Sequence, residues 1–115
     1  MYGKELILDI HNCDPSLFTR EILEAFLAEL CDLIDMERCD LHWWDDHVSE
    51  EPHLRGISAV QFIKTSNITI HTIELMRHVY LNIFSCKDFN DNTATDFVEN
   101  FFGGKIVNRV CIGRV

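Results

Sequence analysis

The chain lacks several features that mark common protein classes. No apolar run approaches the ~20 residues that a membrane helix needs, so no membrane span is predicted. The N-terminus has no basic region followed by an apolar stretch, which is the pattern of a secretory signal peptide. Proline occurs twice and glycine five times, and no linker, repeat or low-complexity tract divides the chain. The 115 residues are therefore expected to form one domain, 1–115.

Basic residues and paired cysteine motifs are also scarce. Ten Lys and Arg stand against 19 Asp and Glu, which gives a formal charge of −9. An acidic surface repels phosphate backbones, so no nucleic-acid partner is expected, and cationic small molecules are more natural ligands. The five cysteines are an odd number without a CxxC pair. Reduced thiols in the cytoplasm are therefore predicted.

The hydrophobic periodicity predicts an α+β protein. Apolar and polar residues alternate over six segments, which we interpret as strands: 4–11, 39–44, 56–64, 66–72, 78–86 and 105–114. A 3.6-residue period predicts helices over about 15–36 and 93–102, the second capped by Asp91 or Thr93 and ended by Gly103. Short links favour antiparallel pairing. We expect a two-layer sandwich with a mainly antiparallel sheet and two helices on one face, so that the other face needs water or a partner protomer.

Ser66 and His71 lie five residues apart in the strand-like run KTSNITIHT. Side chains alternate along a strand, so residues 66, 68 and 70 share one face and residues 67, 69 and 71 the other. The two side chains meet only if the chain bends near Ser66. A serine at a kinked strand start with a histidine nearby is a candidate for chemistry on the backbone itself. A polar strand with solvated hydroxyls is the alternative interpretation.

Three other features each have two interpretations. Cys86 ends a predicted strand, where functional groups become accessible, although a cysteine is also a small core residue. The segment 42–53 carries three histidines and four carboxylates, which suit zinc, but their spacing matches no recognised site and a solvated loop explains them equally. No metal is therefore predicted. Trp43 and Trp44 are adjacent and face opposite ways, so one is expected in the core and the other at an interface or a substrate.

The segment Ser66–Thr72 (SNITIHT) resembles the Glu-Ser-His-x-Ser/Thr-Ile-His-Thr-Trp-Pro-Glu motif of the short prokaryotic S-adenosylmethionine decarboxylases. Gly56-Ile57-Ser58 is similar to the family's Gly-Val-Ser, eight residues before the motif serine. The segment 79–86 (VYLNIFSC) is similar to the family strand that ends in a cysteine twenty residues after that serine. The first strand followed by Cys13-Asp14 is also similar. Four anchors in register are far more specific than any one of them.

The resemblance implies a self-processing enzyme whose pyruvoyl cofactor derives from Ser66. Ser66 would attack the carbonyl of Thr65, and elimination and hydrolysis would then divide the chain into fragments 1–65 and 66–115. His71 would be the base for the α-proton of residue 66, and Ser58 would support the acyl shift. This chemistry needs a hydroxyl nucleophile, an imidazole that is neutral near pH 7 and a bent peptide.

The resemblance also implies how the processed enzyme would act. The pyruvoyl carbonyl would form a Schiff base with a substrate amine and take up the electrons left by departing CO₂. Cys86 would return a proton to the α-carbon, because a thiol with an ordinary pKa of about 8.5 is mostly protonated near neutrality.

Several positions depart from the family pattern, and they concern the cleavage step and the substrate. Thr65 replaces the glutamate before the motif serine, and Asn67 replaces the next histidine. Ile73-Glu74-Leu75 replaces Trp-Pro-Glu, and Pro52 lies where a phenylalanine would stack on adenine. S-adenosylmethionine is the expected substrate, with Glu74 and Trp44 as binding residues. Arginine or ornithine is the alternative, because carboxylates of the 45–51 segment suit a cationic tail: Asp45, Asp46, Glu50 and Glu51.

The resemblance further implies a cytoplasmic homodimer of polyamine and spermidine biosynthesis. A dimer agrees with a sheet whose second face has no helix to cover it. An uncleaved, non-catalytic homologue that acts as a binding or regulatory subunit is the alternative from another class. Self-cleavage between Thr65 and Ser66 distinguishes the two.

Overall fold

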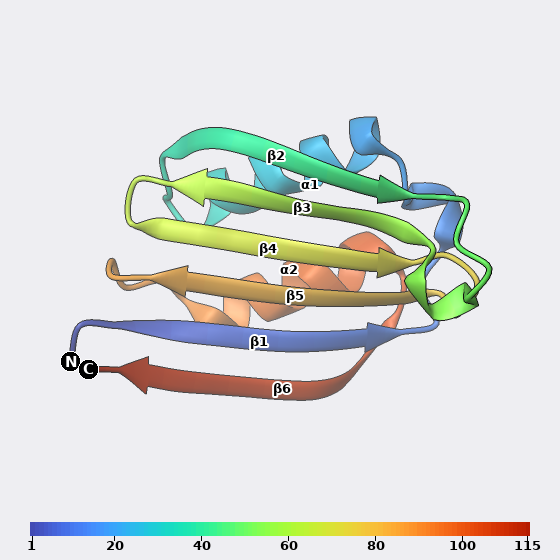
Figure 1. The fold of residues 1–115 in the computed structure, drawn as a ribbon. Coiled ribbons are helices and arrows are strands. Elements are labelled where there is room, and N and C mark those ends of the chain that lie inside the picture. Colours follow the sequence, from blue (N-terminus) through green and yellow to red (C-terminus); the bar gives the residue numbers. More distant parts are fainter.

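A six-stranded antiparallel sheet with two helices on one face makes up the fold (Figure 1). The computed structural model describes all 115 residues. The strands lie in the order β2-β3-β4-β5-β1-β6. Their bounds are β1 Gly3–His11, β2 Arg38–Asp46, β3 Gly56–Ile63, β4 Ser66–Ile73, β5 His78–Ser85 and β6 Lys105–Arg114. The helices are α1 Arg20–Leu33 and α2 Asp91–Phe102, with short 3₁₀ turns at Pro15–Leu17 and Pro52–Leu54.

One hydrophobic core lies between the sheet and the helices. Strand residues of one parity point into it, among them Leu6, Leu8, Ile10, Ile68, Ile70, Leu81 and Ile83. The amphipathic helices contribute Leu23, Phe26, Leu27, Leu30, Val98 and Phe102. The α+β sandwich expected from the sequence is confirmed. None of the helices has the length and apolar character needed to cross a membrane.

Three predicted boundaries were wrong, and local hydrogen bonds explain two of them. The first helix begins at Arg20 rather than at residue 15, because Thr19 Oγ1 accepts the N–H of Ile22 at 3.2 Å and caps it. Asn90, not Asp91 or Thr93, caps α2, since its side chain accepts the N–H of Thr93 at 3.0 Å. Strand β2 continues to Asp46, where a loop was expected from residue 45.

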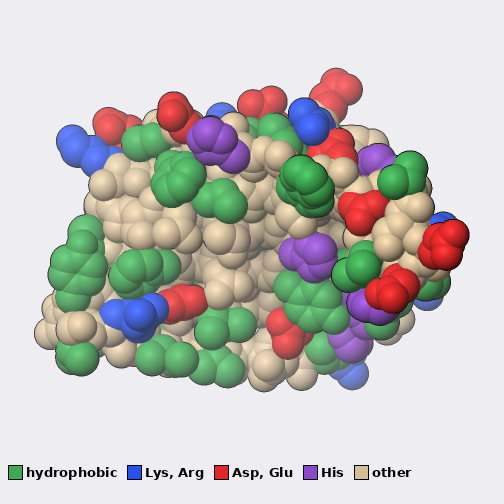
Figure 2. Space-filling model, viewed as in Figure 1, with side chains coloured by type: hydrophobic (Ala, Val, Ile, Leu, Met, Phe, Trp, Pro, Cys, Tyr) green, Lys and Arg blue, Asp and Glu red, His purple; other side chains and the backbone are tan.

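The sheet face away from the helices, called the outer face below, has no helical cover. Figure 2 views this face and shows hydrophobic side chains spread over it with histidines among them. Trp44 is 73% exposed, whereas its neighbour Trp43 packs against the core, as their opposite orientations predicted. Outer-face residues on other strands are also exposed, including Phe62, Val110 and Ile112. Several exposed apolar side chains on one uncovered sheet face are typical of an interaction face.

Candidate functional site

The turn between β3 and β4 holds the backbone of Ser66 in an unusual conformation. Lys64 and Thr65 form a tight turn, after which Ser66 pairs with Ile63 across the hairpin. Ser66 has a φ of 152°, in a region that residues with a side chain rarely adopt. Its Oγ accepts a hydrogen bond from Asn67 Nδ2 at 3.0 Å. The kink expected at the start of this strand is therefore present.

The peptide before Ser66 is held by the residue that follows β5. The backbone N–H of Cys86 donates a 3.1 Å hydrogen bond to the carbonyl oxygen of Thr65. Ser66 itself lies opposite Ser85 in the β4–β5 pair. Cys86 thus lies next to Thr65 and Ser66 at one end of the sheet, although it follows Ser66 by twenty residues in the sequence.

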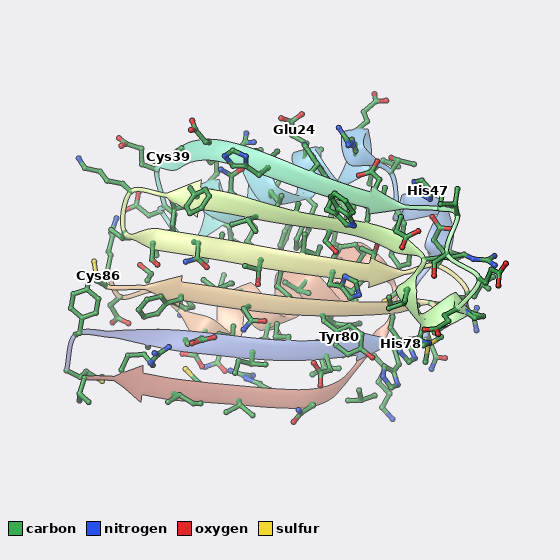
Figure 3. All side chains as sticks on the ribbon, in the orientation of Figure 1. Glu24, Cys39, His47, His78, Tyr80 and Cys86 are labelled. Carbon is green, nitrogen blue, oxygen red and sulfur yellow. The ribbon has the colours of Figure 1, made fainter.

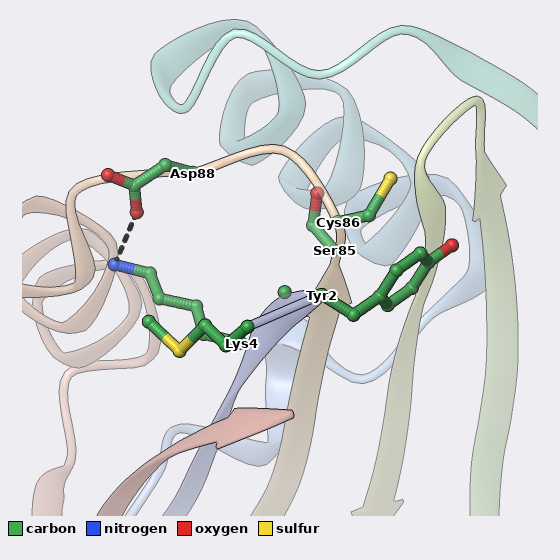
Figure 4. Close-up of a pocket in the computed structure, with 7 residues that line it drawn as sticks. Tyr2, Lys4, Ser85, Cys86 and Asp88 are labelled. Atoms are coloured by element: carbon green, nitrogen blue, oxygen red, sulfur yellow. Dashed lines mark ion pairs between the residues drawn. The ribbon is translucent and has the colours of Figure 1, made fainter. Parts of the chain in front are cut away.

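The Cys86 side chain is exposed and lines a pocket of about 270 Å³ at this end (Figure 4). Tyr2 and the first two residues of β1, Gly3 and Lys4, also line the pocket. Lys4 Nζ pairs with the Asp88 carboxylate at 3.0 Å, as the dashed line in Figure 4 marks. The Cys86 thiol beside Tyr2 raises the pKa of that phenol. The pocket gives a small molecule access to Cys86.

Strand β1 can approach Cys86 this closely because residue 3 is glycine. A Cβ at Gly3 would overlap the carbonyl oxygen of Ser85 and would lie 2.8 Å from Cys86 Cα. Any larger residue would push β1 away from the end of β5. Gly3 therefore sets the distance between the wall of the pocket and Cys86.

Ser58 and His71 form a second pair, on the outer face. They lie opposite each other on β3 and β4, with Ser58 Oγ and His71 Nδ1 2.5 Å apart. Trp44 lies beside Ser58 on β2, and Tyr80 lies beside His71 on β5 with the two rings 6.2 Å apart. Burial lowers the pKa of His71. The imidazole is therefore neutral near pH 7 and can act as a base.

The two groups of residues lie toward opposite ends of the sheet. Strand β4 runs without interruption from Ser66 to Ile73, so Ser66 and His71 are about 16 Å apart at ~3.3 Å per residue. Figure 3 shows the two ends of the sheet, with Cys86 at one end and His47, His78 and Tyr80 at the other. The bend at Ser66 does not bring the two side chains together. One protomer therefore brings Ser58 to His71, and Cys86 to Ser66, but it does not join the two pairs.

Glu74 and the carboxylate-rich segment lie at the His71 end. Glu74 Oε1 lies 3.0 Å from His47 Nδ1, and His47 Nε2 lies 4.0 Å from Asp45 Oδ2. Asp45 is also paired with Arg20 Nε at 2.9 Å. Trp44 and Ser58 line a shallow pocket of about 160 Å³ on the same part of the sheet. No three metal-ligating side chains converge here.

The sequence interpretation missed Ser85, which is completely buried and touches Thr65. Thr65 Oγ1 and Ser85 Oγ are 2.7 Å apart. The alternation of the sequence could have identified it, because Ser85 is the next inward-facing position of β5 after Val79, Leu81 and Ile83. A hydroxyl at such a position needs a hydrogen-bond partner.

Comparison with known proteins places the chain in a family. The family model described as S-adenosylmethionine decarboxylase matches residues 4–114. The S-adenosylmethionine decarboxylase proenzyme of Saccharolobus solfataricus is 29% identical over 85 residues, which are 73% of this chain and 63% of that protein. The match thus spans less than two thirds of the length of this relative.

The fold has a close counterpart among solved structures. The crystal structure of the adenosylmethionine decarboxylase from Aquifex aeolicus VF5 matches with a TM-score of 0.80 and 17% identity, over 98% of this chain and 90% of that chain. At this identity the likeness concerns the fold. The family assignment rests on the family model, which covers nearly the whole sequence. The chain belongs to the S-adenosylmethionine decarboxylase family.

Proposed function

We propose that the chain is a proenzyme that cleaves itself between Thr65 and Ser66 and becomes a pyruvoyl-dependent decarboxylase. One observation carries this proposal: the carbonyl of Thr65 accepts the Cys86 N–H at 3.1 Å, while the adjoining Ser66 has a φ of 152°. A serine nucleophile next to a strained peptide whose carbonyl already has a hydrogen-bond donor suits an acyl shift. The proposed products are the fragments 1–65 and 66–115.

In the first step, Ser66 Oγ attacks the carbonyl carbon of Thr65. The Oγ–C bond forms, the C–N bond breaks, and the hydroxyl proton passes to the nitrogen of Ser66. The Cys86 N–H stabilises the negative charge that develops on the Thr65 oxygen. A backbone in a rarely populated region costs about 1–3 kcal/mol, and breaking the C–N bond releases this strain.

In the second step, a base removes the α-proton of residue 66. The Cβ–Oγ bond breaks, the Thr65 carboxylate leaves, and water replaces the nitrogen, which departs as ammonia. We assign the base to His71, whose pKa is lowered by burial. When Ser58 Oγ accepts the Nδ1–H of His71, the free lone pair lies on Nε2. Ser58 thereby selects the tautomer that can act as the base.

The distance between Ser66 and His71 implies that two protomers share the site. Because about 16 Å separates these residues along β4, we assign the base to His71 of the partner subunit. A two-fold axis that packs two outer faces with the strands reversed brings opposite ends of the sheet together. The uncovered apolar outer face supports this homodimer, since Trp44, Phe62 and Ile112 are exposed on it.

The pyruvoyl group would supply the electron sink for loss of CO₂ from a substrate amine. The residues present suit this group, because Ser66 starts β4 opposite Ser85, which lines the same pocket as Cys86. Cys86 Sγ–H would hold the proton that is returned to the α-carbon. The pocket of about 270 Å³ leaves room for the reacting end of a substrate.

We assign S-adenosylmethionine as the substrate and place the reaction in cytoplasmic polyamine biosynthesis, where its product would serve spermidine formation. Trp44 is the ring available to stack on adenine, since it is 73% exposed beside Ser58. Arginine or ornithine is the second candidate. The carboxylates of Glu74 and Asp45 favour it, because they cluster at the end of the sheet that the homodimer brings to Ser66.

Intact mass spectrometry tests the proposal. The wild-type protein should give two fragments that divide after Thr65, and Ser66→Ala should remain a single full-length species. A wild-type chain that stays intact in every preparation would make it an uncleaved, non-catalytic homologue. Release of CO₂ from S-adenosylmethionine, arginine and ornithine, measured side by side, identifies the substrate. Activity on the amino acids alone would reject S-adenosylmethionine.

A further inference from the structure

We infer that Thr65 and Ser85 form a hydroxyl clamp that positions the Thr65–Ser66 peptide for self-cleavage. The inference rests on the proposed function and goes beyond it, because neither residue is the nucleophile, the base or the proton donor. The two hydroxyl oxygens are 2.7 Å apart. They join the residue on the carbonyl side of the cleaved bond to the last residue of β5.

The Ser85 side chain is held by burial, by a hydrogen bond and by a thioether contact. Its side chain is completely buried, and its Oγ accepts the backbone N–H of Lys87 at 3.0 Å. Met36 Sδ lies 3.6 Å from Ser85 Oγ and 3.5 Å from Thr65 Oγ1, so the thioether packs against both hydroxyls. Water is therefore excluded from Ser85, and Thr65 supplies its hydroxyl partner.

The clamp and the Cys86 amide hold the same residue at two points. Ser85 engages the side chain of Thr65, and the N–H of Cys86 engages its carbonyl oxygen. Two attachments from adjacent residues prevent rotation of the peptide, so the carbonyl stays directed at its donor while Ser66 attacks. Restricting a reacting group to the productive orientation accelerates an intramolecular step.

Threonine suits this position for a physical reason. A β-branched side chain is restricted at χ1, so Thr65 loses little freedom when it points its hydroxyl at Ser85. Without that hydroxyl, Ser85 would keep only weaker contacts for its own proton. The clamp therefore assigns a role to Thr65, a position where the chain departs from the family motif.

The experiment compares Thr65→Val, which keeps the shape and removes the hydroxyl, with Thr65→Ser, which keeps the hydroxyl. Thr93→Val, the same change on α2 away from the turn, is the matched control. Cleavage of freshly translated protein is followed by intact mass. Loss of one buried hydrogen bond should slow Thr65→Val roughly 5- to 20-fold, and Thr65→Ser should recover the rate. Ser85→Ala should slow cleavage similarly, and the double variant little more than either single variant.

A second readout separates positioning from a loss of stability. In a His71→Ala background the second step stops, so the ester formed by the acyl shift accumulates and hydroxylamine cleaves it. Thr65→Val should lower the ester fraction while the thermal midpoint of the folded protein changes little. Equal ester fractions and equal cleavage rates with and without the hydroxyl would overturn the clamp. Wild-type cleavage in the same series shows that the proposed function stands regardless of that result.

Discussion

Ser58 Oγ and His71 Nδ1 are 2.5 Å apart across β3 and β4, whereas His71 is five residues along the strand from Ser66. The proposed base and the hydroxyl that would orient it thus lie together in one protomer, but away from the proposed cleavage site. The homodimer proposed above would resolve this separation, and it leads to a prediction that a single-chain site would not make.

Coexpression of Ser66→Ala and His71→Ala chains should restore cleavage that neither variant shows alone. In a mixed dimer, the His71→Ala chain keeps its own Ser66 and meets His71 of the partner subunit. Mass spectrometry should find that the cleaved chains all carry the His71→Ala change. As the control, a Ser66→Ala/His71→Ala double variant coexpressed with His71→Ala should give no fragments. An uncleaved mixture in the first experiment would contradict the shared site.

Cleavage should be independent of pH near neutrality and should slow in acid. Burial lowers the pKa of His71 below its ordinary value of about 6.5, so the imidazole is neutral and active at pH 7. The rate should fall only where His71 becomes protonated, below about pH 6.5. Rates of cleavage from pH 5 to 8 test this expectation. A rate that still rises steeply above pH 7 would exclude His71 as the base.

The same pKa shift makes a prediction about stability. Because the folded state holds His71 neutral, the unfolded chain binds the proton more readily, and stability is lost as the pH falls below about 6.5. His78, whose pKa burial and nearby His11 also lower, contributes in the same direction. Urea unfolding of Ser66→Ala, with and without His71→Ala, isolates the contribution of His71 to the pH dependence of the free energy of unfolding. The dependence on pH should be shallower without this histidine.

Cys86→Ala should separate processing from turnover. The backbone N–H that holds the Thr65 carbonyl remains in this variant, so cleavage into two fragments should continue. Loss of the thiol proton should lower the rate of turnover, measured as CO₂ release, by about 10²- to 10⁴-fold. Protonation at the wrong atom of the product is the other expected effect. Cys39→Ala, at another exposed cysteine, is the control. Unchanged turnover in Cys86→Ala would remove this residue from the reaction.

Gly56→Ala should strongly destabilise the fold. A Cβ at Gly56 would overlap the backbone carbonyl oxygen of Thr72, which cannot move without disturbing β4. Overpacking of this kind costs about 1–3 kcal/mol, and rigid backbone places this site at the upper end. Gly113→Ala is the control, because its Cβ would meet only the flexible end of Met1. Denaturant midpoints that match for the two variants would contradict this packing.

The fold was largely predictable because alternation and helical periods are local properties. All six strands and both helices lie close to their predicted positions, and the alternation along β4 correctly separated Ser66 from His71. The start of α1 was not predicted correctly, because Thr19 competes as a helix cap with the earlier Asp14–Pro15 turn. Side-chain hydrogen bonds over one or two residues decide such boundaries, and the hydrophobic period does not record them.

Contacts between strands were harder to predict than the strands themselves. That Ser58 lies opposite His71 follows from the tight turn at Lys64 and Thr65, which sets the β3–β4 register. The contact between Thr65 and Ser85 also needs the β4–β5 register and the position of Met36, on a segment distant in the sequence. Register depends on turn geometry and packing together, so hydrophobic pattern alone could not reveal the clamp.

The strand order has a consequence for a chain cut after Thr65. The first fragment would contribute β1, β2 and β3, and the second β4, β5 and β6. In the sheet, however, β1 lies between β5 and β6, so the two pieces are interlaced rather than stacked end to end. They could not part without breaking three strand pairings and the shared core. The cut would therefore free a new chain end for chemistry while the two fragments continue to behave as one folded body.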